Sequence, residues 1–205
     1  MVLKKSGEIK KIIDSLGPRL INKIKIAHKI ADIGCAEGEL LKVLYRQFKK
    51  PQENLYGFEI NTQFMARAKK LFPHIYQADF SRRQAAKRAF DLVFCLDVVE
   101  HVEKPNLLLA NLAGWLKKDG FLVLATPNPD SLSHFLMGSR WFGFKDKTHR
   151  RFYRLLDLRR LLEKQGLKVA MAKSISCSGN NLYDRLISFL GLGGEIILLA
   201  QKNED

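Results

Sequence analysis

A short glycine-containing segment, DIGCAEG at residues 32–38, has the composition of a ligand-binding turn. It follows an apolar, strand-like run that ends at Ile33, and it precedes a stretch with helical spacing that begins at Glu39. The small residues at positions 34, 36 and 38 let the backbone pass close to a ligand. The N–H groups at the start of the following helix would point toward the same ligand. The segment therefore predicts a small-molecule site where the first strand ends.

Two carboxylates, Glu59 and Asp79, extend this pattern to the next two strands. Glu59 closes the second predicted strand, 21 residues after Gly38, where a carboxylate can accept hydrogen bonds from both hydroxyls of a ribose. Asp79 ends the third, where its carboxylate can accept a hydrogen bond from an adenine amino group. Each feature alone fits a tight turn or a surface acid. Together, in order and each at a strand end, they favour a nucleoside site.

A second group, Asp97, Glu100 and His101, has the spacing i, i+3 and i+4 after a further predicted strand. If the chain turns helical there, the three side chains share one face at the mouth of the site. His149, at the end of a long connection, is expected to converge with them. Carboxylates with imidazoles can hold a divalent ion such as Mg²⁺, and an imidazole can act as a general base. The structural alternative is that these residues order a loop, cap a helix or pack.

The elements that must position these residues alternate between short strands and longer helices, which indicates an α/β domain with a mostly parallel sheet. Seven strands are expected, at residues 29–33, 55–58, 74–77, 90–96, 121–125, 167–175 and 195–201. Helices are expected at residues 39–50, 61–71, 105–118 and 155–165. Pro105 and Gly120 are the expected start and stop signals of the third helix. Residues 1–205 are predicted to form one domain, with residues 1–27 as a helical N-terminal extension.

Two long connections have no clear periodicity. Residues 126–149 contain four large aromatic side chains: Phe135, Trp141, Phe142 and Phe144. Because such side chains are costly to leave in water, this segment is predicted to be a lid or a wall over a substrate. Residues 176–194 are expected to hold a helix around residues 183–190. We expect these two segments to determine which substrate is bound.

The chain is strongly basic: 35 Lys and Arg against 21 Asp and Glu give a net charge of +14, with 46% apolar residues. The basic residues are concentrated in residues 1–29, 42–88 and 139–173. An anionic partner such as RNA or an acidic membrane surface would account for this charge. No RNA-module signature and no aromatic-rich basic stripe occurs, which favours a solvated cationic surface instead.

Three observations bear on the location of the protein. No apolar run approaches the roughly 20 residues needed to span a bilayer. The N-terminus lacks the uninterrupted apolar stretch of a cleaved secretory signal. The three cysteines, at positions 35, 95 and 177, are far apart and form no C-x-x-C pair. We therefore predict a cytoplasmic protein without a membrane span.

The ordered motifs resemble those of class I S-adenosylmethionine-dependent methyltransferases. The resemblance rests on DIGCAEG (32–38), YGFEI (56–60), ADF (78–80), FDLVFCLDVVEHV (90–102), LKKDGFLVLATPNP (116–129) and THRRFYRLLDLRRLLEKQGL (148–167). It implies a Rossmann-like three-layer sandwich whose seven-stranded sheet has an antiparallel last strand. It also implies S-adenosylmethionine as the cofactor. The implied cofactor-binding residues are Asp32, Gly34, Cys35, Ala36, Gly38, Glu59, Ile60, Asp79, Phe80, Leu96 and Asp97.

The same resemblance assigns parts of the cofactor to parts of this set. Residues 34–38 lie under the methionine part, with Cys35 contributing its backbone N–H. Glu59 lies on the ribose, and Asp79 with Phe80 lies beside the adenine. One departure is Ala36, where many members carry glycine; its methyl group is small, and this variant should still admit the cofactor.

The segment around Glu100 resembles the E-x-x-E-H segment, with a later His, of ubiquinone-type O-methyltransferases and small-RNA 3′-end methyltransferases. Those positions are metal-linked in these families, which implies Glu100, His101 and His149 as metal ligands. Asp97 replaces the first Glu of the pattern and is one methylene shorter, which leaves open whether a Mg²⁺ ion is used. His101 and His149 are the implied catalytic residues.

Methyl transfer from a sulfonium needs no protein nucleophile, because the enzyme has only to align an acceptor with an already activated methyl group. The leading expectation is transfer to an oxygen of a small molecule, with a base that removes its proton. The alternatives are an RNA acceptor on the basic surface, and a partner subunit that binds the cofactor without turnover. A nicotinamide-dependent oxidoreductase ranks behind them, because the usual G-x-G-x-x-G spacing is missing. The sequence identifies neither the acceptor nor the oligomeric state.

Overall fold

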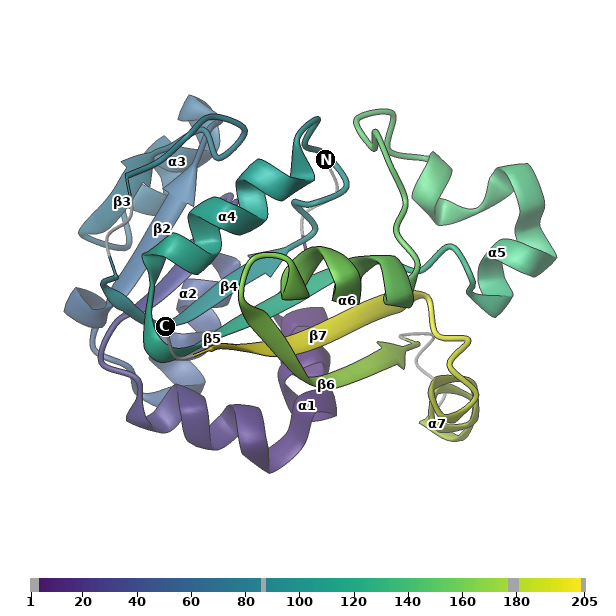
Figure 1. The fold of residues 1–205 in the computed structure, drawn as a ribbon. Helices are drawn as coiled ribbons and strands as arrows, with labels where there is room; N and C mark the ends of the chain where they lie inside the picture. Colours follow the sequence, from purple (N-terminus) through teal and green to yellow (C-terminus); the bar gives the residue numbers. More distant parts are fainter. Residues whose placement is uncertain (1–3, 86–87, 177–180, 204–205) are drawn as a thin grey trace.

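A seven-stranded sheet forms the centre of the computed structural model, which describes residues 4–85, 88–176 and 181–203 (Figure 1). The strand order is β3-β2-β1-β4-β5-β7-β6. The strands are β1 Ile30–Ile33, β2 Leu55–Glu59, β3 His74–Gln77, β4 Phe90–Leu96, β5 Leu116–Pro127, β6 Leu167–Ile175 and β7 Glu195–Lys202. Strands β1 to β5 pair in parallel, whereas β7 is antiparallel to both of its neighbours. The predicted fold class is confirmed, including the antiparallel last strand.

Helices cover both faces of the sheet and complete three layers (Figure 1). One face carries α1 Ser6–Ile26, α2 Glu39–Phe48 and α3 Thr62–Lys69; the other carries α4 Pro105–Trp115 and α6 Leu155–Glu163. Shorter elements are α5 Leu132–Met137, α7 Asn181–Phe189 and the 3₁₀ turns η1 Gln52–Asn54, η2 Gly138–Arg140 and η3 Phe142–Phe144. In the described part of the chain, no helix has both the length and the apolar character needed to cross a bilayer.

The central strands are apolar on both sides because helices bury both of their faces. In β4, Leu92 and Phe94 pack toward α1 and α2, whereas the alternate residues Val93 and Cys95 pack toward α4 and α6. This burial on both sides explains why these strands read as continuous apolar runs in the sequence.

The N-terminal extension is helical, as predicted, and it belongs to the core. Helix α1 kinks at Gly17, whose φ of 63° lies in the left-handed region, directly before Pro18. Its buried side chains recur every three or four residues: Ile9, Ile12, Ile13, Leu16, Leu20 and Ile24. This stripe packs against α2 and the sheet, so α1 is an integral part of one layer.

The predicted end of helix α4 is wrong, because the helix stops at Trp115 and β5 begins at Leu116. The buried side chain of Leu116 and its pairing with Phe90 in β4 start the strand early. Gly120 therefore lies inside the strand segment and does not end the helix. A Cβ at Gly120 would lie 2.9 Å from the Lys117 carbonyl oxygen and 3.2 Å from that of Phe90, so this glycine permits close backbone approach.

Asp91 fixes the start of β1 against β4. Its carboxylate accepts hydrogen bonds from the backbone N–H groups of His28 at 3.0 Å and Lys29 at 2.7 Å. It also accepts one from Lys117 Nζ at 2.7 Å. Burial alone raises the pKa of Asp91, but Lys117 and these N–H groups outweigh it and hold the pKa below its usual value.

We expect Asp91→Ala to lower the free energy of unfolding by about 2 kcal/mol at neutral pH, because three donors lose a charged acceptor. Since the folded-state pKa is depressed, this stabilisation is present above the unfolded pKa of about 4 and is lost as pH falls through the folded value. Urea unfolding at neutral and acid pH measures the difference, with Glu53→Ala, an exposed carboxylate, as control. Equal midpoints for both variants at neutral pH would contradict the assignment.

Candidate active site

The loop between β1 and α2 has the backbone that its small residues predict. Gly34 and Gly38 have φ values of +72° and +82°, in the region that glycine adopts without strain. A Cβ at Gly34 would lie 2.6 Å from Val98 Cγ2, so a larger residue would force a shift. Ala36, the departure from the family pattern, has a φ of +45° and is the strained member of the loop.

Glu59 holds this loop against the end of β2. Its Oε2 accepts a hydrogen bond from the Ala36 N–H at 2.9 Å, and its Oε1 accepts one from the Asn61 N–H at 2.8 Å. The first of these bonds fixes the strained residue in place. Each carboxylate oxygen keeps a second lone pair that can accept a further hydrogen bond. The ribose contact of Glu59 stays a prediction.

A narrow cleft lies beside the loop. Its walls include six residues predicted to bind cofactor, namely Asp32, Gly34, Cys35, Ala36, Leu96 and Asp97. The cleft encloses about 60 Å³, and Lys4 and Ile9 from the start of the chain line it as well. Ligand sites commonly have volumes of at least about 300 Å³. The cleft in this structure is thus narrower than a typical ligand site, and the start of the chain forms one of its walls.

One predicted donor in the loop is already engaged. The N–H of Cys35 donates to the carbonyl oxygen of Phe58 at 3.1 Å, and the contact of Cys35 with a ligand stays a prediction. The same carbonyl accepts the N–H of Gly34 at 2.8 Å. These two bonds join the loop to β2, and the Cys35 thiol is buried.

The predicted adenine-binding residues lie at the same edge of the sheet but outside the cleft. The carboxylate of Asp79 accepts hydrogen bonds from the N–H of Ser81 at 2.9 Å and from its hydroxyl at 2.5 Å. The Phe80 ring is buried edge-on against Phe58 and Trp115, so it packs in the core. Ile60 is largely exposed. The contact between Asp79 and a nucleobase stays a prediction.

The chain after β4 forms a turn and not the helix that the i, i+3, i+4 spacing predicted. Asp97 has a φ of 53°, which is incompatible with starting a helix, and the N–H of His101 closes a turn on the Val98 carbonyl at 3.0 Å. The expected common face of three side chains is therefore wrong. Asp97 turns toward Lys4, whereas Glu100 is buried and accepts a hydrogen bond from the Thr126 hydroxyl at 2.9 Å.

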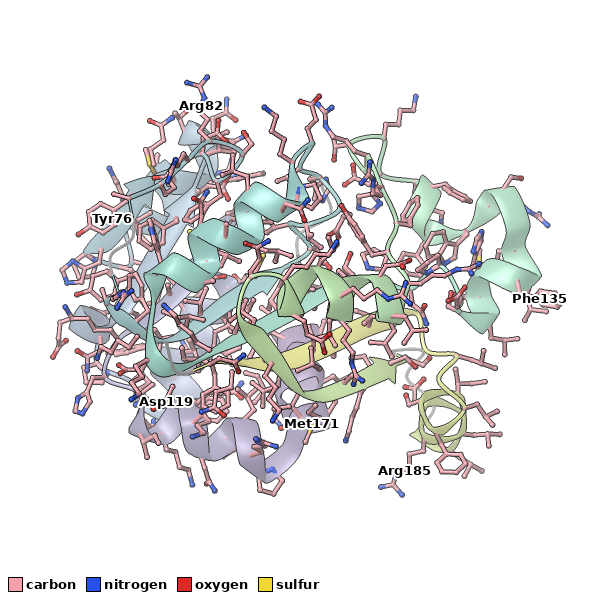
Figure 2. All side chains as sticks on the ribbon, viewed as in Figure 1. Tyr76, Arg82, Asp119, Phe135, Met171 and Arg185 are labelled. Carbon is pink, nitrogen blue, oxygen red and sulfur yellow. The ribbon has the colours of Figure 1, made fainter. Side chains whose placement is uncertain are left out.

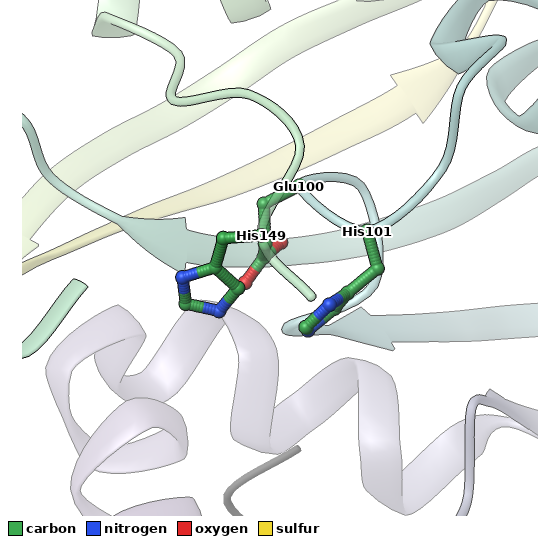
Figure 3. A group of neighbouring side chains, drawn as sticks. All are labelled: Glu100, His101 and His149. Carbon is green, nitrogen blue, oxygen red and sulfur yellow. The ribbon is translucent and has the colours of Figure 1, made fainter. Parts of the chain in front are cut away.

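Glu100, His101 and His149 come together at this turn (Figure 3). One nitrogen or oxygen atom from each of the three lies within 4.8 Å of the others, and the two imidazole centroids are 4.7 Å apart. The backbone carbonyl of Glu100 accepts the N–H of Arg150 at 2.8 Å, which ties the end of the long connection to the turn. The structure thus places His149 beside His101, although 48 residues separate them in the sequence.

Hydrogen-bond partners assign the tautomers of both imidazoles. The Thr148 hydroxyl donates to Asp146 at 2.5 Å, so it can only accept from His101 Nδ1, 2.9 Å away. His149 Nδ1 lies 2.6 Å from the Gly143 carbonyl oxygen, which is an acceptor only. Both Nδ1 atoms therefore carry a proton. In the neutral form of either ring, Nε2 is then the atom that carries the free lone pair.

Burial and neighbouring charge tune this group. Burial, together with the nearby His149, lowers the pKa of His101 and keeps its imidazole neutral at physiological pH. Burial, reinforced by the negative charge of Asp97, raises the pKa of Glu100 to about 8. Glu100 Oε1 is buried and has no hydrogen-bond partner within the described ranges. A carboxylate oxygen with two imidazole nitrogens is a donor set that can hold a divalent cation.

A cavity of about 550 Å³ opens in front of the two histidines, within the usual range for small-molecule sites. The two long connections supply most of its wall, with His101 and His149 on one side. Its other lining residues are Lys4, Glu8, Asp97, Pro127, Ser133, Phe142, Lys145, Asp146, Ile175, Ser176, Ile187, Leu192, Gly194 and Glu195. Lys4 and Asp97 also line the cleft beside the glycine loop, so the two spaces adjoin.

Sequence reasoning missed Lys4 and Glu195, which lie at this junction. Lys4 Nζ is 2.7 Å from Asp97 Oδ2 and 2.5 Å from Glu195 Oε1. Burial alone would lower the pKa of Lys4, but Glu195 and Asp97 outweigh it and raise the pKa well above the usual value. Because β7 is antiparallel, its first residue lies where the parallel strands end. Sequence reasoning that considers only the residues after each strand therefore misses Glu195, which is the first residue of β7.

The aromatic residues of the long connection divide between core and surface. Trp141 is fully buried, whereas Phe142 and Phe144 are partly exposed. Phe135 is 85% exposed and points away from the rest of the molecule (Figure 2), so the expectation that it would be covered is wrong. The first two residues of the predicted lid, Thr126 and Pro127, belong to β5. The role of the segment as a lid stays a prediction.

Comparison with known proteins decides the family. Residues 4–171 match the family model described as a methyltransferase domain. The chain is a class I S-adenosylmethionine-dependent methyltransferase. S-adenosylmethionine is accordingly the cofactor of this methyltransferase, as the resemblance of its ordered motifs implied.

Curated relatives of the methyltransferase are distant. It is 26% identical to a ubiquinone biosynthesis O-methyltransferase of Neisseria meningitidis serogroup C, over 84% of this chain and 79% of the relative. It is also 26% identical to a malonyl-[acyl-carrier protein] O-methyltransferase of Halalkalibacterium halodurans, over 58% of this chain. That match spans 47% of the relative, about half of its length.

A solved structure agrees with the fold. A SAM-dependent methyltransferase from Archaeoglobus fulgidus superposes with a TM-score of 0.70 at 20% identity, over 94% of both chains. At this level of identity the likeness shows the fold alone. The acceptor of the methyltransferase must therefore be argued from its own cavity.

Proposed function

We propose that this methyltransferase transfers a methyl group to an oxygen atom of a small-molecule acceptor bound in the 550 Å³ cavity. One observation carries the proposal: two imidazoles, His101 and His149, line this cavity next to the cofactor cleft, and a hydrogen bond holds Nδ1 of each ring. Hydroxyl acceptors need such a base, because their oxygen is a poor nucleophile while it keeps its proton. Both curated relatives described above are named as O-methyltransferases.

In this mechanism the cavity would hold the acceptor hydroxyl beside an imidazole Nε2, and the Nε2 atom would take the hydroxyl proton. Bound S-adenosylmethionine would supply its methyl group to the acceptor oxygen and would leave as S-adenosylhomocysteine. Alignment of the two reactants supplies most of the acceleration, because the sulfonium is already activated. The Asp146–Thr148–His101 chain keeps the imidazole in the tautomer that can accept the proton.

Glu100, His101 and His149 would hold a divalent cation if the protein binds one. The buried Oε1 of Glu100, which lacks a partner among the residues described, fits this role. Such an ion would lower the pKa of an acceptor hydroxyl bound to it. Asp97 does not add to the donor set, because its carboxylate pairs with Lys4. We favour the base role of the imidazoles, which needs no ion.

Calorimetric titration with S-adenosylhomocysteine and then with NAD, each with and without Mg²⁺, tests the cofactor part of the proposal. We expect S-adenosylhomocysteine to bind and NAD to give no heat. A transfer assay with labelled S-adenosylmethionine and a pool of phenols, carboxylic acids and amines then tests the acceptor atom. Labelled ethers or esters support the proposal, whereas methylated amines as the product would refute it.

We also propose that residues 1–205 work as one domain in the reducing cytoplasm. The buried Cys35 and Cys95 support this location, because both are free thiols and neither is paired. The third cysteine, Cys177, lies outside the described residues.

A further inference from the structure

Helix α7 presents an apolar face to solvent. Leu182, Leu186, Phe189 and Leu190 have the spacing i, i+4, i+7 and i+8, which places them on one side of the helix. All four are more than half exposed, and Phe189 reaches 87%. Ile187, on another side of the helix, is buried and lines the acceptor cavity. The helix therefore packs with one apolar side and leaves a second one uncovered.

The segment around α5 has a matching apolar surface. Phe135, Leu136 and Met137 are exposed in sequence at the end of α5, and Phe142 and Phe144 of η3 are partly exposed. The Leu132 N–H donates to the Leu192 carbonyl at 3.0 Å, which joins the start of α5 to the loop after α7. Figure 1 shows both helices beyond the same end of the sheet. We call these nine exposed side chains of α5, η3 and α7 the apolar rim.

The apolar rim borders the acceptor cavity. Phe142 of η3 and Ile187 of α7 both line that cavity, together with residues of the connecting loops. Large exposed apolar patches are uncommon on monomeric proteins unless they bind something. Whatever covers the rim therefore lies beside the mouth through which an acceptor enters.

Basic residues are interspersed with the apolar rim along the sequence. Residues 130–154 contain six Lys or Arg against two Asp, and all six cations are exposed. Arg185 of α7 is also exposed and projects from the helix (Figure 2). The acids nearby are engaged: Asp146 holds Thr148, Asp184 pairs with Lys11, and Asp130 pairs with Arg154. The surface thus combines large apolar side chains with a net positive charge.

We propose that the apolar rim docks on an anionic lipid surface. Apolar side chains that enter the headgroup region, flanked by Lys and Arg that face acidic lipids, are the features of interfacial helices. A second copy of this chain fits less well, because each copy would bring its own cations to the contact and repel the other. RNA also fits less well, because five of the nine rim side chains are leucine or methionine, which cannot stack on bases as the four phenylalanines can. The acceptor cavity would then open toward the lipid.

Co-sedimentation with vesicles tests this proposal without cofactor or acceptor, so its outcome is independent of the proposed function. We expect the full chain to bind vesicles of phosphatidylglycerol with phosphatidylcholine. Binding to phosphatidylcholine alone should be weaker, and added salt should weaken binding to the mixture. Leu186→Ser combined with Phe189→Ser should lower the partition coefficient at least about tenfold, because two large apolar side chains no longer enter the lipid. Arg185→Gln should lower it about fivefold.

Ile26→Ser is the matched control, because Ile26 is an apolar side chain that is 67% exposed but lies away from the rim. It ends α1, next to the start of β1, whereas the rim lies beyond the other end of the strands. It should bind vesicles as the unaltered chain does. Phe135→Ser provides a second rim variant if the double variant unfolds. Equal binding of rim and control variants, or no preference for anionic vesicles, would overturn the proposal. The proposal would also be overturned if the unaltered chain formed a dimer or an RNA complex and the rim substitutions abolished it.

Discussion

Replacement of His101 by alanine is expected to lower kcat by about 10² to 10⁴ while affinity for S-adenosylhomocysteine stays unchanged. General-base catalysis contributes about this factor, and His101 lies beside the acceptor cavity, not among the lining residues of the cofactor cleft. Single-turnover methyl transfer measures the rate, and calorimetry measures cofactor binding. His28→Ala is the control, because His28 is an exposed histidine before β1.

A companion substitution separates a base from a merely structural imidazole. Thr148→Val removes the hydroxyl that holds Nδ1 of His101 and so frees the tautomer. We expect a smaller loss of rate than in His101→Ala and a changed pH profile, with the fold unaffected. Dialysis of the enzyme against EDTA then tests whether turnover needs a divalent cation. Turnover that survives EDTA assigns the imidazoles to proton transfer, whereas turnover that needs added Mg²⁺ assigns them to an ion. Full activity of His101→Ala would rule out both roles.

Replacement of Glu59 by alanine is expected to weaken S-adenosylhomocysteine binding by about 100-fold. Loss of two charge-assisted hydrogen bonds to a ribose would cost about 3 kcal/mol, which corresponds to this factor. The carboxylate also orders the strained Ala36 through its N–H. The measurement is calorimetric titration, with Glu163→Ala, an exposed carboxylate of α6, as control.

A second ligand tells the two roles of Glu59 apart. Methylthioadenosine has the ribose and the adenine but lacks the amino-acid end. If Glu59 binds the ribose, the affinity of methylthioadenosine for the Glu59→Ala variant falls by the same factor as the affinity of S-adenosylhomocysteine. If Glu59 only orders the loop under the amino-acid end, methylthioadenosine keeps its affinity. Unchanged binding of both ligands would show that the ribose assignment is wrong.

Most of the sheet was predictable because its signals are local. Buried parallel strands appear in the sequence as apolar runs. The start of α3 is equally local, because the side-chain oxygen of Asn61 accepts hydrogen bonds from the N–H groups of Gln63 and Phe64. The glycine loop also follows from residue type, since Gly34 and Gly38 adopt conformations that other residues avoid. In these places the residues act on their immediate neighbours.

The errors arose where distant contacts decide the outcome. Nothing local indicates that Asp97 adopts a positive φ, which turned an expected helix into a turn. Lys4 carries no sequence signal, yet it bridges Asp97 and Glu195 across nearly the whole chain. Phe135 was expected to be covered, because exposing a large apolar side chain to water costs free energy. Under the docking proposal, contact with a lipid surface would offset this cost.

The position of β7 has a consequence for synthesis of the protein on the ribosome. Strand β7 follows the other six strands along the chain, yet it lies between β5 and β6 and is the partner that joins them. Until residues 195–202 emerge, β6 has no neighbour in the sheet, and β5 keeps an open edge of the kind that promotes aggregation. The nascent chain can thus assemble its nucleoside-binding half during translation. The acceptor half can close only once residues 195–202 are available, so it is the part of the sheet that forms later.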